Sequence, residues 1–284
     1  MTDLARPARP NDAVVIESAR RTVSLPTYVR EAWERRRLVR VLAARQLRST
    51  YEINIVGFAW WLLEPLSLAL VYYALFTFIF RRNQPHYLLT LLVALLPFKW
   101  LSQTTTQSMG TIRGNAALIL DVYFPRALLP VTEAVVGLAH FGVALLVLPL
   151  TMLAYRTWGG IHIVWLPVIA AVQLVLIMGI AFPMSVWGIG YRNLPGVVSN
   201  ALRLWFYLSP GIWTLELVEK RRLLIRTLVW LNPLTGLLDG YRRALIEGRP
   251  PGLTLAWTAI VAVGLFAGGL AYFVRREGQF GKML

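Results

Sequence analysis

Long apolar segments alternate with short polar ones along most of this chain. A helix needs about 20 mainly apolar residues to cross the hydrocarbon core of a bilayer. Six segments approach or exceed that length, so the pattern predicts six transmembrane helices, at about residues 55–80, 87–109, 128–155, 163–189, 197–217 and 253–274. The chain is therefore expected to fold as an all-α integral membrane protein.

The residues before the first apolar segment follow a different pattern. Within residues 26–49, apolar side chains such as Val29 and Trp33 recur at helical spacing, and seven arginines occupy the other positions. A basic amphipathic helix is typical of a membrane interface, although a soluble helix packed on a partner would share this pattern. Residues 1–25 are rich in Pro, Ala and Arg and are expected to form a flexible cytoplasmic arm.

Two further apolar runs, between the fifth and sixth predicted spans, are too short to cross a bilayer. Residues 223–231 make up about half a span, and Asn232 and Pro233 interrupt them. Runs of this length are typical of re-entrant or interfacial helices. We expect extracytoplasmic re-entrant helices over residues 223–245.

The stretch 110–130, between the second and third predicted spans, is too polar at its start to cross. Residues 116–122 can form a short amphipathic helix before Phe124 and Pro125 interrupt it. A short helix at a membrane surface is a natural place for another protein to dock.

Composition agrees with this picture and narrows the chemistry. Only 15% of the 284 residues are charged, against about a quarter in soluble domains. The net charge of +15 is explained by arginines that flank spans and are attracted to anionic lipid, so no nucleic-acid partner is expected. Cysteine is absent and the three histidines are scattered, so no metal site is expected.

The distribution of lysine and arginine predicts the orientation of the chain. With six spans, 17 of the 29 basic residues fall on the side of the termini, 10 fall on the opposite side, and Lys99 and Arg203 lie within spans. The positive-inside rule then places both termini and residues 110–130 in the cytoplasm. No secretory signal peptide is visible, and the expected location is the cytoplasmic (inner) membrane.

Polar and aromatic residues within the spans are candidates for a transport path. Polar residues of the second span either line a pore or form interhelical hydrogen bonds at a helix end. Aromatic residues of the fifth span either form an interfacial belt or a surface on which sugar rings stack. The channel-lining candidates are Gln103, Thr106, Gln107, Trp205, Phe206, Tyr207 and Trp213.

Two opposite charges fall at matching depths in the first and second spans. Glu64 lies about 13 Å from the cytoplasmic end of its span, and Lys99 lies about 12 Å from the same face. We therefore predict that Glu64 and Lys99 pair within the membrane. A structural ion pair is favoured over a proton relay, since no chain of further acids or histidines follows it in the sequence.

Five segments resemble one known family when taken in order: RQLRSTYEINIVGFAWWLLEPL, NAALILDVYFPRALLP, YRNLPGVVSNALRLWFYLSPGIW, LNPLTGLLDGYRRAL and FVRREGQFGKML. They are similar to the permease subunit of ABC-2-type polysaccharide exporters, which export O-antigen, teichoic acid and related glycans. The resemblance covers about residues 45–284. The arginine-rich, lysine-poor composition is compatible with an actinobacterial galactan exporter.

The resemblance implies a homodimer of this chain around a channel, driven by two separate ATP-binding subunits that hold ATP and Mg. It implies a polyprenyl-diphosphate-linked polysaccharide as substrate, with Arg37, Arg45 and Arg48 as candidates for binding the diphosphate. It also implies a cytoplasmic coupling helix over residues 115–123 that docks on the ATPase. The coupling candidates are Asn115, Leu118, Asp121, Tyr123, Phe124 and Arg126. The chain departs from the usual family residues at Gln46, Glu64 and Lys99.

Catalysis by the chain itself is not expected. No Walker A pattern, catalytic triad or paired carboxylates stand out, so ATP hydrolysis must belong to a partner and no cofactor is expected here. One alternative is an ABC-2 permease for drugs or antibiotics. An alternative of another class is a membrane-embedded glycan- or lipid-modifying enzyme, which would need acids or histidines that converge at the interface.

Overall fold

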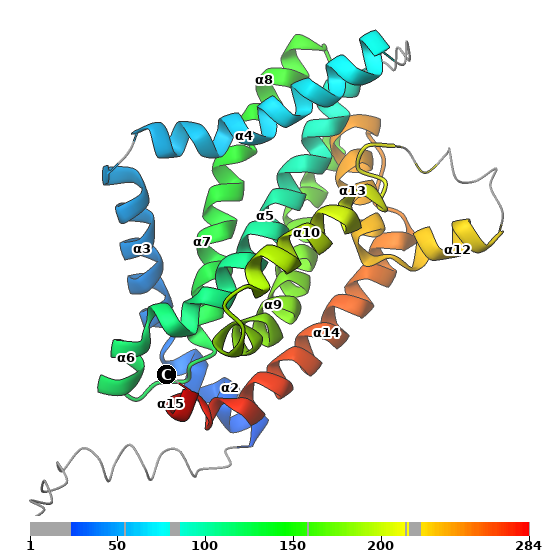
Figure 1. Cartoon of the computed structure of the whole chain (residues 1–284). Coiled ribbons are helices and arrows are strands. Elements are labelled where there is room, and N and C mark those ends of the chain that lie inside the picture. Colours follow the sequence, from blue (N-terminus) through cyan, green and yellow to red (C-terminus); the bar gives the residue numbers. More distant parts are fainter. Residues whose placement is uncertain are drawn as a thin grey trace, which may run out of the picture.

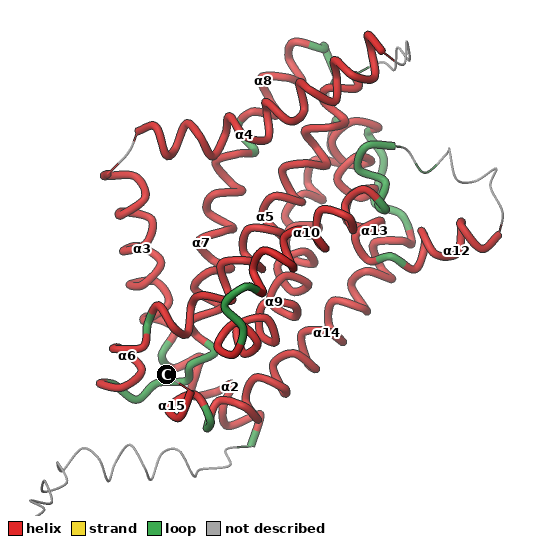
Figure 2. Tube along the Cα trace, viewed as in Figure 1, coloured by secondary structure: helices red, strands yellow, loops and turns green. Residues whose placement is uncertain are grey.

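The computed structural model describes residues 24–53, 55–79, 86–157, 159–213, 215 and 223–283. Over this part of the chain the fold consists of helices and loops, with no strand (Figure 2). The α-helices are α2 (Leu25–Glu34), α3 (Arg36–Ile53), α4 (Ile55–Ala74), α5 (Tyr87–Gly114), α6 (Ala116–Asp121), α7 (Leu128–Ala144), α8 (Val147–Ala154), α9 (Leu166–Gly190), α10 (Leu194–Tyr207), α12 (Leu223–Leu231), α13 (Pro233–Arg242), α14 (Leu253–Glu277) and α15 (Phe280–Met283). The prediction of an all-α fold is confirmed, and the arm predicted over residues 1–25 lies almost wholly outside the described residues.

Four described segments are long and apolar enough to cross a membrane: Tyr87–Gly114, Leu128–Ala154, Gly160–Gly190 and Leu253–Glu277. They coincide with the second, third, fourth and sixth predicted spans. Their long helices α5, α7, α9 and α14 pack against one another as a bundle (Figure 1). In the same view α2, α6 and α15 gather at one end of the bundle, and α8 lies at the other.

The fifth predicted span is shorter than the apolar run suggested. The helix α10 ends at Tyr207, and the chain turns at Leu208–Gly211 instead of continuing to residue 217. Pro210 has no backbone N–H and disfavours helical backbone at the residue before it, which ends the helix. The continuous helix predicted over 197–217 is therefore wrong. The first predicted span is helical over its described residues, as α4 followed by a π-helical turn at Leu75–Ile79.

The basic N-terminal segment forms two helices where one was predicted. Non-helical backbone at Arg35 separates α2 from α3, and α3 continues to Ile53 alongside α7. Tyr28, Val39 and Ala43 are buried, while most of the arginines are exposed. The amphipathic pattern thus places one face of these helices against the bundle and leaves the basic face outside.

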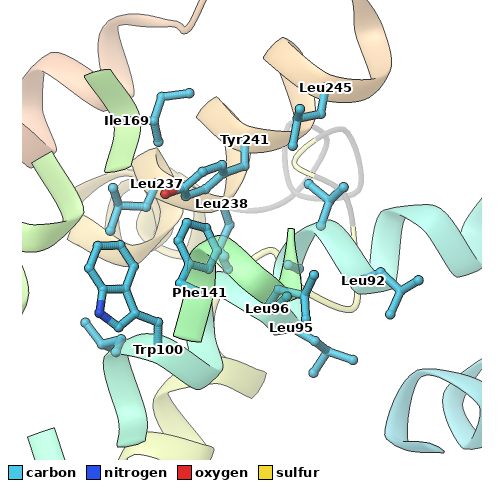
Figure 3. Close-up of a cluster of buried hydrophobic side chains, with 14 of the residues drawn as sticks. Leu92, Leu95, Leu96, Trp100, Phe141, Ile169, Leu237, Leu238, Tyr241 and Leu245 are labelled. Carbon is cyan, nitrogen blue, oxygen red and sulfur yellow. The ribbon is translucent and has the colours of Figure 1, made fainter. Parts of the chain in front are cut away.

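The helix α5 forms the centre of the bundle and contacts α4, α7, α9, α10 and α13. Its Trp100 stacks on Phe141 of α7 with ring centroids 4.9 Å apart, and Phe141 meets the edge of Tyr241 of α13 at 6.0 Å. Figure 3 shows Phe141 between Trp100 and Tyr241, beside buried aliphatic side chains. The segment predicted to be re-entrant therefore contributes α13 directly to the core.

Small residues allow the helices that flank this core to approach closely. A Cβ atom at Gly188 of α9 would overlap the backbone of Met109 in α5. A Cβ atom at Gly269 of α14 would overlap the carbonyl oxygen of Gly179 in α9. Close backbone approach at small residues is the usual way in which membrane helices associate, so these glycines fix α5, α9 and α14 as one unit.

Candidate functional site

A groove of about 730 Å³ opens between α4, α5 and α10. The polar positions of α5 recur at helical spacing, which places them on one face of that helix. That face lines the groove with Lys99, Ser102, Gln103, Thr106 and Gln107. The intervening residues of α5 point into the bundle, so the polar stripe is set apart by the helical period.

Seven of the residues singled out from the sequence line this groove: Glu64, Lys99, Gln103, Thr106, Gln107, Phe206 and Tyr207. They come from three helices that are far apart in the sequence. The structure therefore brings the polar second span and part of the aromatic fifth span to one place.

Glu64 and Lys99 lie in contact at the wall of the groove. The Lys99 Nζ atom donates a hydrogen bond to Glu64 Oε2 at 2.7 Å. The Lys99 side chain is 13% exposed and the Glu64 side chain is 61% exposed in the single chain. The Glu64 carboxylate thus faces the groove, and the Lys99 ammonium is more deeply buried.

A second polar contact joins α4 to α10 across the same groove. The Tyr72 hydroxyl donates to the Tyr207 hydroxyl at 2.9 Å. Phe206 also lines the groove, and its ring stacks on Phe98 of α5 with centroids 4.5 Å apart. The helix α4 is therefore fastened to α5 through an ion pair and to α10 through a tyrosine pair.

Trp205 and Trp213, two of the channel-lining candidates, lie outside the groove. The indole of Trp205 donates to Asn232 Oδ1 at 2.8 Å, and the Asn232 amide donates to Ser209 Oγ at 2.8 Å. Trp213 donates to the carbonyl oxygen of Tyr207 at 3.2 Å. Trp205, through Asn232, thus fastens the end of α10 to the start of α13, and Trp213 bonds the chain after the turn back to the end of α10.

The diphosphate candidates lie on the basic face of α3. Arg37 and Arg48 are exposed, and Arg45 lines a second cavity, of about 420 Å³, between α3, α5 and α7. In this cavity Gln46 Nε2 donates to Glu133 Oε2 at 3.0 Å. Sequence reasoning missed Glu133, although an acid within an apolar run is itself a signal of a functional or paired site.

The coupling candidates surround α6 at the end of the bundle where α2 and α15 also lie (Figure 1). Asn115 precedes α6, and its side-chain amide donates to the carbonyl oxygen of Thr111 at 2.8 Å. Ile119 is buried and Leu118 is partly buried, whereas Asp121 and Tyr123 are exposed. The exposed surface at the end of α6, which we call the α6 patch, consists of Leu120, Asp121, Val122 and Tyr123.

The loop after the α6 patch is held in place from two sides. The backbone N–H of Arg126 donates to Glu277 Oε1 at 2.8 Å, and Arg126 Nη1 donates to the Glu277 carbonyl oxygen at 2.7 Å. Arg35 donates to the carbonyl oxygen of Tyr123, and its guanidinium lies 5.3 Å from the Tyr123 ring centroid. Phe124 is buried between these contacts. Arg126, one of the predicted coupling residues, is thus bonded to Glu277 within this chain.

Tyr28 completes this arrangement, which we call the Glu277 clamp (Tyr28, Arg126 and Glu277). The Tyr28 hydroxyl accepts a hydrogen bond from the backbone N–H of Ala127 at 3.1 Å and also bonds the Glu277 carboxyl group. Burial, with the nearby Glu277, raises the pKa of Tyr28 well above its usual value, so the phenol stays protonated. Sequence reasoning missed Tyr28 and Glu277, which lie at opposite ends of the chain.

Breaking the Glu277 clamp is expected to loosen the loop after the α6 patch. In Glu277→Ala the Arg126 N–H and the Tyr28 hydroxyl lose their carboxylate partner. The free energy of opening this loop should fall by about 1–3 kcal/mol. Amide hydrogen exchange over residues 122–128 of the purified protein should rise. The matched control is Gln279→Ala, because Gln279 is exposed and its side chain accepts a hydrogen bond from Arg276, outside the clamp. Unchanged exchange over 122–128 would show that the clamp does not hold the loop.

No family model matches the chain. Over 252 residues, 88% of this chain and 96% of the relative, the sequence is 31% identical to an O-antigen export system permease protein of Myxococcus xanthus. An O-antigen export system permease protein of Klebsiella pneumoniae is 25% identical over 87% of this chain and 95% of its own length. A polysialic acid transport protein of Escherichia coli is 25% identical over 85% of this chain and 94% of its own length.

Proposed function

This chain belongs to the family of O-antigen export system permeases, and on that premise we propose that it forms the membrane path of a polysaccharide exporter. The observation that carries the proposal is the groove between α4, α5 and α10. A glycan has many hydroxyl groups and cannot cross lipid without polar partners or water. The polar stripe of α5 supplies such partners along one face of that helix. The chain acts as a transport subunit, and export of drugs is the less favoured alternative.

A second copy of the chain closes the channel in this proposal. A polar groove that faced lipid directly would expose its charged and polar side chains to the hydrocarbon core, which is costly. Two grooves that face each other in a homodimer avoid this cost and leave room for a glycan chain. Glu64, which is more exposed than Lys99 in the single chain, then lies at the lumen.

The proposed topology keeps six crossings with both termini in the cytoplasm. The helices α4 and α10 supply the first and fifth crossings. At 14 residues α10 is about 21 Å long, and the buried turn at Ser209, Pro210 and Gly211 carries the chain further. Non-helical backbone at membrane depth needs burial in protein of this kind. The helices α12 and α13 are the extracytoplasmic re-entrant elements.

The energy source is a separate ATP-binding subunit, two copies of which dock at the cytoplasmic end of the dimer. The sequence has no Walker A pattern of its own, so ATP and Mg belong to that partner. The α6 patch is the proposed docking surface, since it is exposed and lies at the end of the bundle that also holds α2 and α15. The Glu277 clamp makes the loop behind it rigid enough to pass a movement to α7 and α14.

The proposed substrate is a polysaccharide linked to a polyprenyl diphosphate, of the O-antigen, teichoic acid or galactan type. Arg37, Arg45 and Arg48 present exposed cations along α3. Arginine suits a diphosphate because its planar guanidinium binds two phosphate oxygens at once.

Reconstitution tests this function directly. The chain and its ATP-binding partner are placed in proteoliposomes that contain a lipid-linked glycan, and ATP-dependent appearance of the glycan on the far leaflet is measured. Export is expected with both subunits, and none is expected with the permease alone or with an ATPase that cannot hydrolyse ATP. ATP hydrolysis without glycan transfer, with every component present, would contradict the proposal.

A further inference from the structure

The second cavity, between α3, α5 and α7, differs from the groove in its lining. It holds about 420 Å³, which falls within the range of about 300–1,000 Å³ typical of small-ligand sites. Arg45, Gln46, Gln107, Asn115 and Glu133 line it, together with hydroxyl groups. Carboxylate, amide and hydroxyl groups therefore converge on one space from three helices.

These polar groups are held by contacts within the chain. Glu133 is buried, and its carboxylate accepts hydrogen bonds from the Gln46 amide at 3.0 Å and from the Thr111 hydroxyl. The Asn115 amide donates to the Thr111 carbonyl oxygen at 2.8 Å. A carboxylate offers several acceptor positions and an amide offers both donors and acceptors, so each retains capacity for a ligand.

The two charged residues that line the cavity suit different parts of a ligand. Arg45, on the exposed face of α3, attracts an anion. Glu133, buried on α7, repels one and instead suits hydroxyl groups, which donate to a carboxylate. A ligand with an anionic group at Arg45 and a hydroxylated ring beside Gln46 and Glu133 satisfies both ends.

We propose that this cavity binds the first sugar of the lipid-linked glycan, the ring attached to the diphosphate, and selects it through Gln46 and Glu133. The inference rests on the proposed function and adds a specificity site to it. Gln107 lines both this cavity and the groove, so the two spaces adjoin at that residue. A sugar bound in the cavity lies where the remainder of the glycan enters the transport path.

Binding to defined lipids tests the site. The full export complex in nanodiscs is titrated with undecaprenyl diphosphate, and with the same lipid bearing one hexose or one N-acetylhexosamine. At least one sugar-bearing lipid should bind about tenfold more tightly than the bare diphosphate, the equivalent of about 1.4 kcal/mol. In Glu133→Gln and in Gln46→Ala this preference should fall to about twofold or less, the level expected when one or two hydrogen bonds are lost.

The bare lipid diphosphate serves as an internal test of folding, because its affinity should not change in these two variants. Arg45→Ala should weaken all the lipids together. The matched control for the loss of a carboxylate is Glu34→Gln, since Glu34 is exposed and pairs with Arg30 on the outer face of α2.

Two outcomes separate this inference from the function on which it rests. If the wild-type complex exports glycan but binds the sugar-bearing and bare lipids equally, the sugar site is wrong and the exporter stands. If Glu133→Gln keeps the full preference for sugar, selection by Glu133 is wrong. A complex that neither binds these lipids nor exports glycan contradicts both proposals.

Discussion

Replacing Asp121 and Tyr123 together with alanine is expected to stop export while leaving the permease folded in the membrane. Both side chains are exposed on the α6 patch, so their loss removes no core contact. An exposed aromatic residue and a charge beside apolar Leu120 and Val122 have the composition of a docking hot spot. Loss of two such groups should weaken the ATPase interaction by about tenfold or more.

Two measurements check this expectation: co-purification of the ATP-binding subunit with the permease, and export of glycan at equal permease levels. Both should fall in the double variant. Tyr191→Ala is a suitable control, because Tyr191 is an exposed aromatic residue in the loop before α10, outside the α6 patch. Export at the wild-type level in Asp121→Ala with Tyr123→Ala would remove the α6 patch from the coupling mechanism.

Local features of the chain were predictable from the sequence. The length of an apolar run is a local property, and the runs that became α5, α9 and α14 are close to their predicted bounds. The polar stripe of α5 was also visible, because Gln103 and Gln107 recur at the helical period. Helical periodicity shows which residues share a face, but it does not show which neighbour that face meets.

Features that depend on tertiary contacts were not predictable from the sequence. Trp205 donates to the distant Asn232, and the spacing of residues in α10 does not indicate that partner. The contact between Tyr28 and Glu277 joins the two ends of the chain, and no spacing in the sequence indicates it. Gln46 and Glu133 come together only because α3 lies along α7.

Reversing the charge at Glu64 or at Lys99 alone is expected to abolish most export, and reversing both is expected to restore it. In the wild type, Lys99 Nζ lies 2.7 Å from Glu64 Oε2. Glu64→Lys places two ammonium groups at this contact, and Lys99→Glu places two carboxylates there. An exposed pair contributes about 0–1 kcal/mol, and breaking a buried one costs about 3–5 kcal/mol. In this pair Glu64 is exposed and Lys99 is largely buried. Either single change is therefore expected to lower the free energy of unfolding by about 2 kcal/mol.

Export and thermal stability of the purified permease are measured for both single variants and for Glu64→Lys with Lys99→Glu. The exposed pair of Arg30 and Glu34 provides the matched control, since reversing either of its charges should have little effect. A neutral pair, Glu64→Gln with Lys99→Gln, separates structure from proton transfer. If the pair only fastens α4 to α5, the neutral version keeps export, because removing both partners of a buried pair is often close to neutral. Failure of the double reversal to restore export would mean that each charge acts on the substrate or on the second copy, and that their contact in the single chain is not what transport requires.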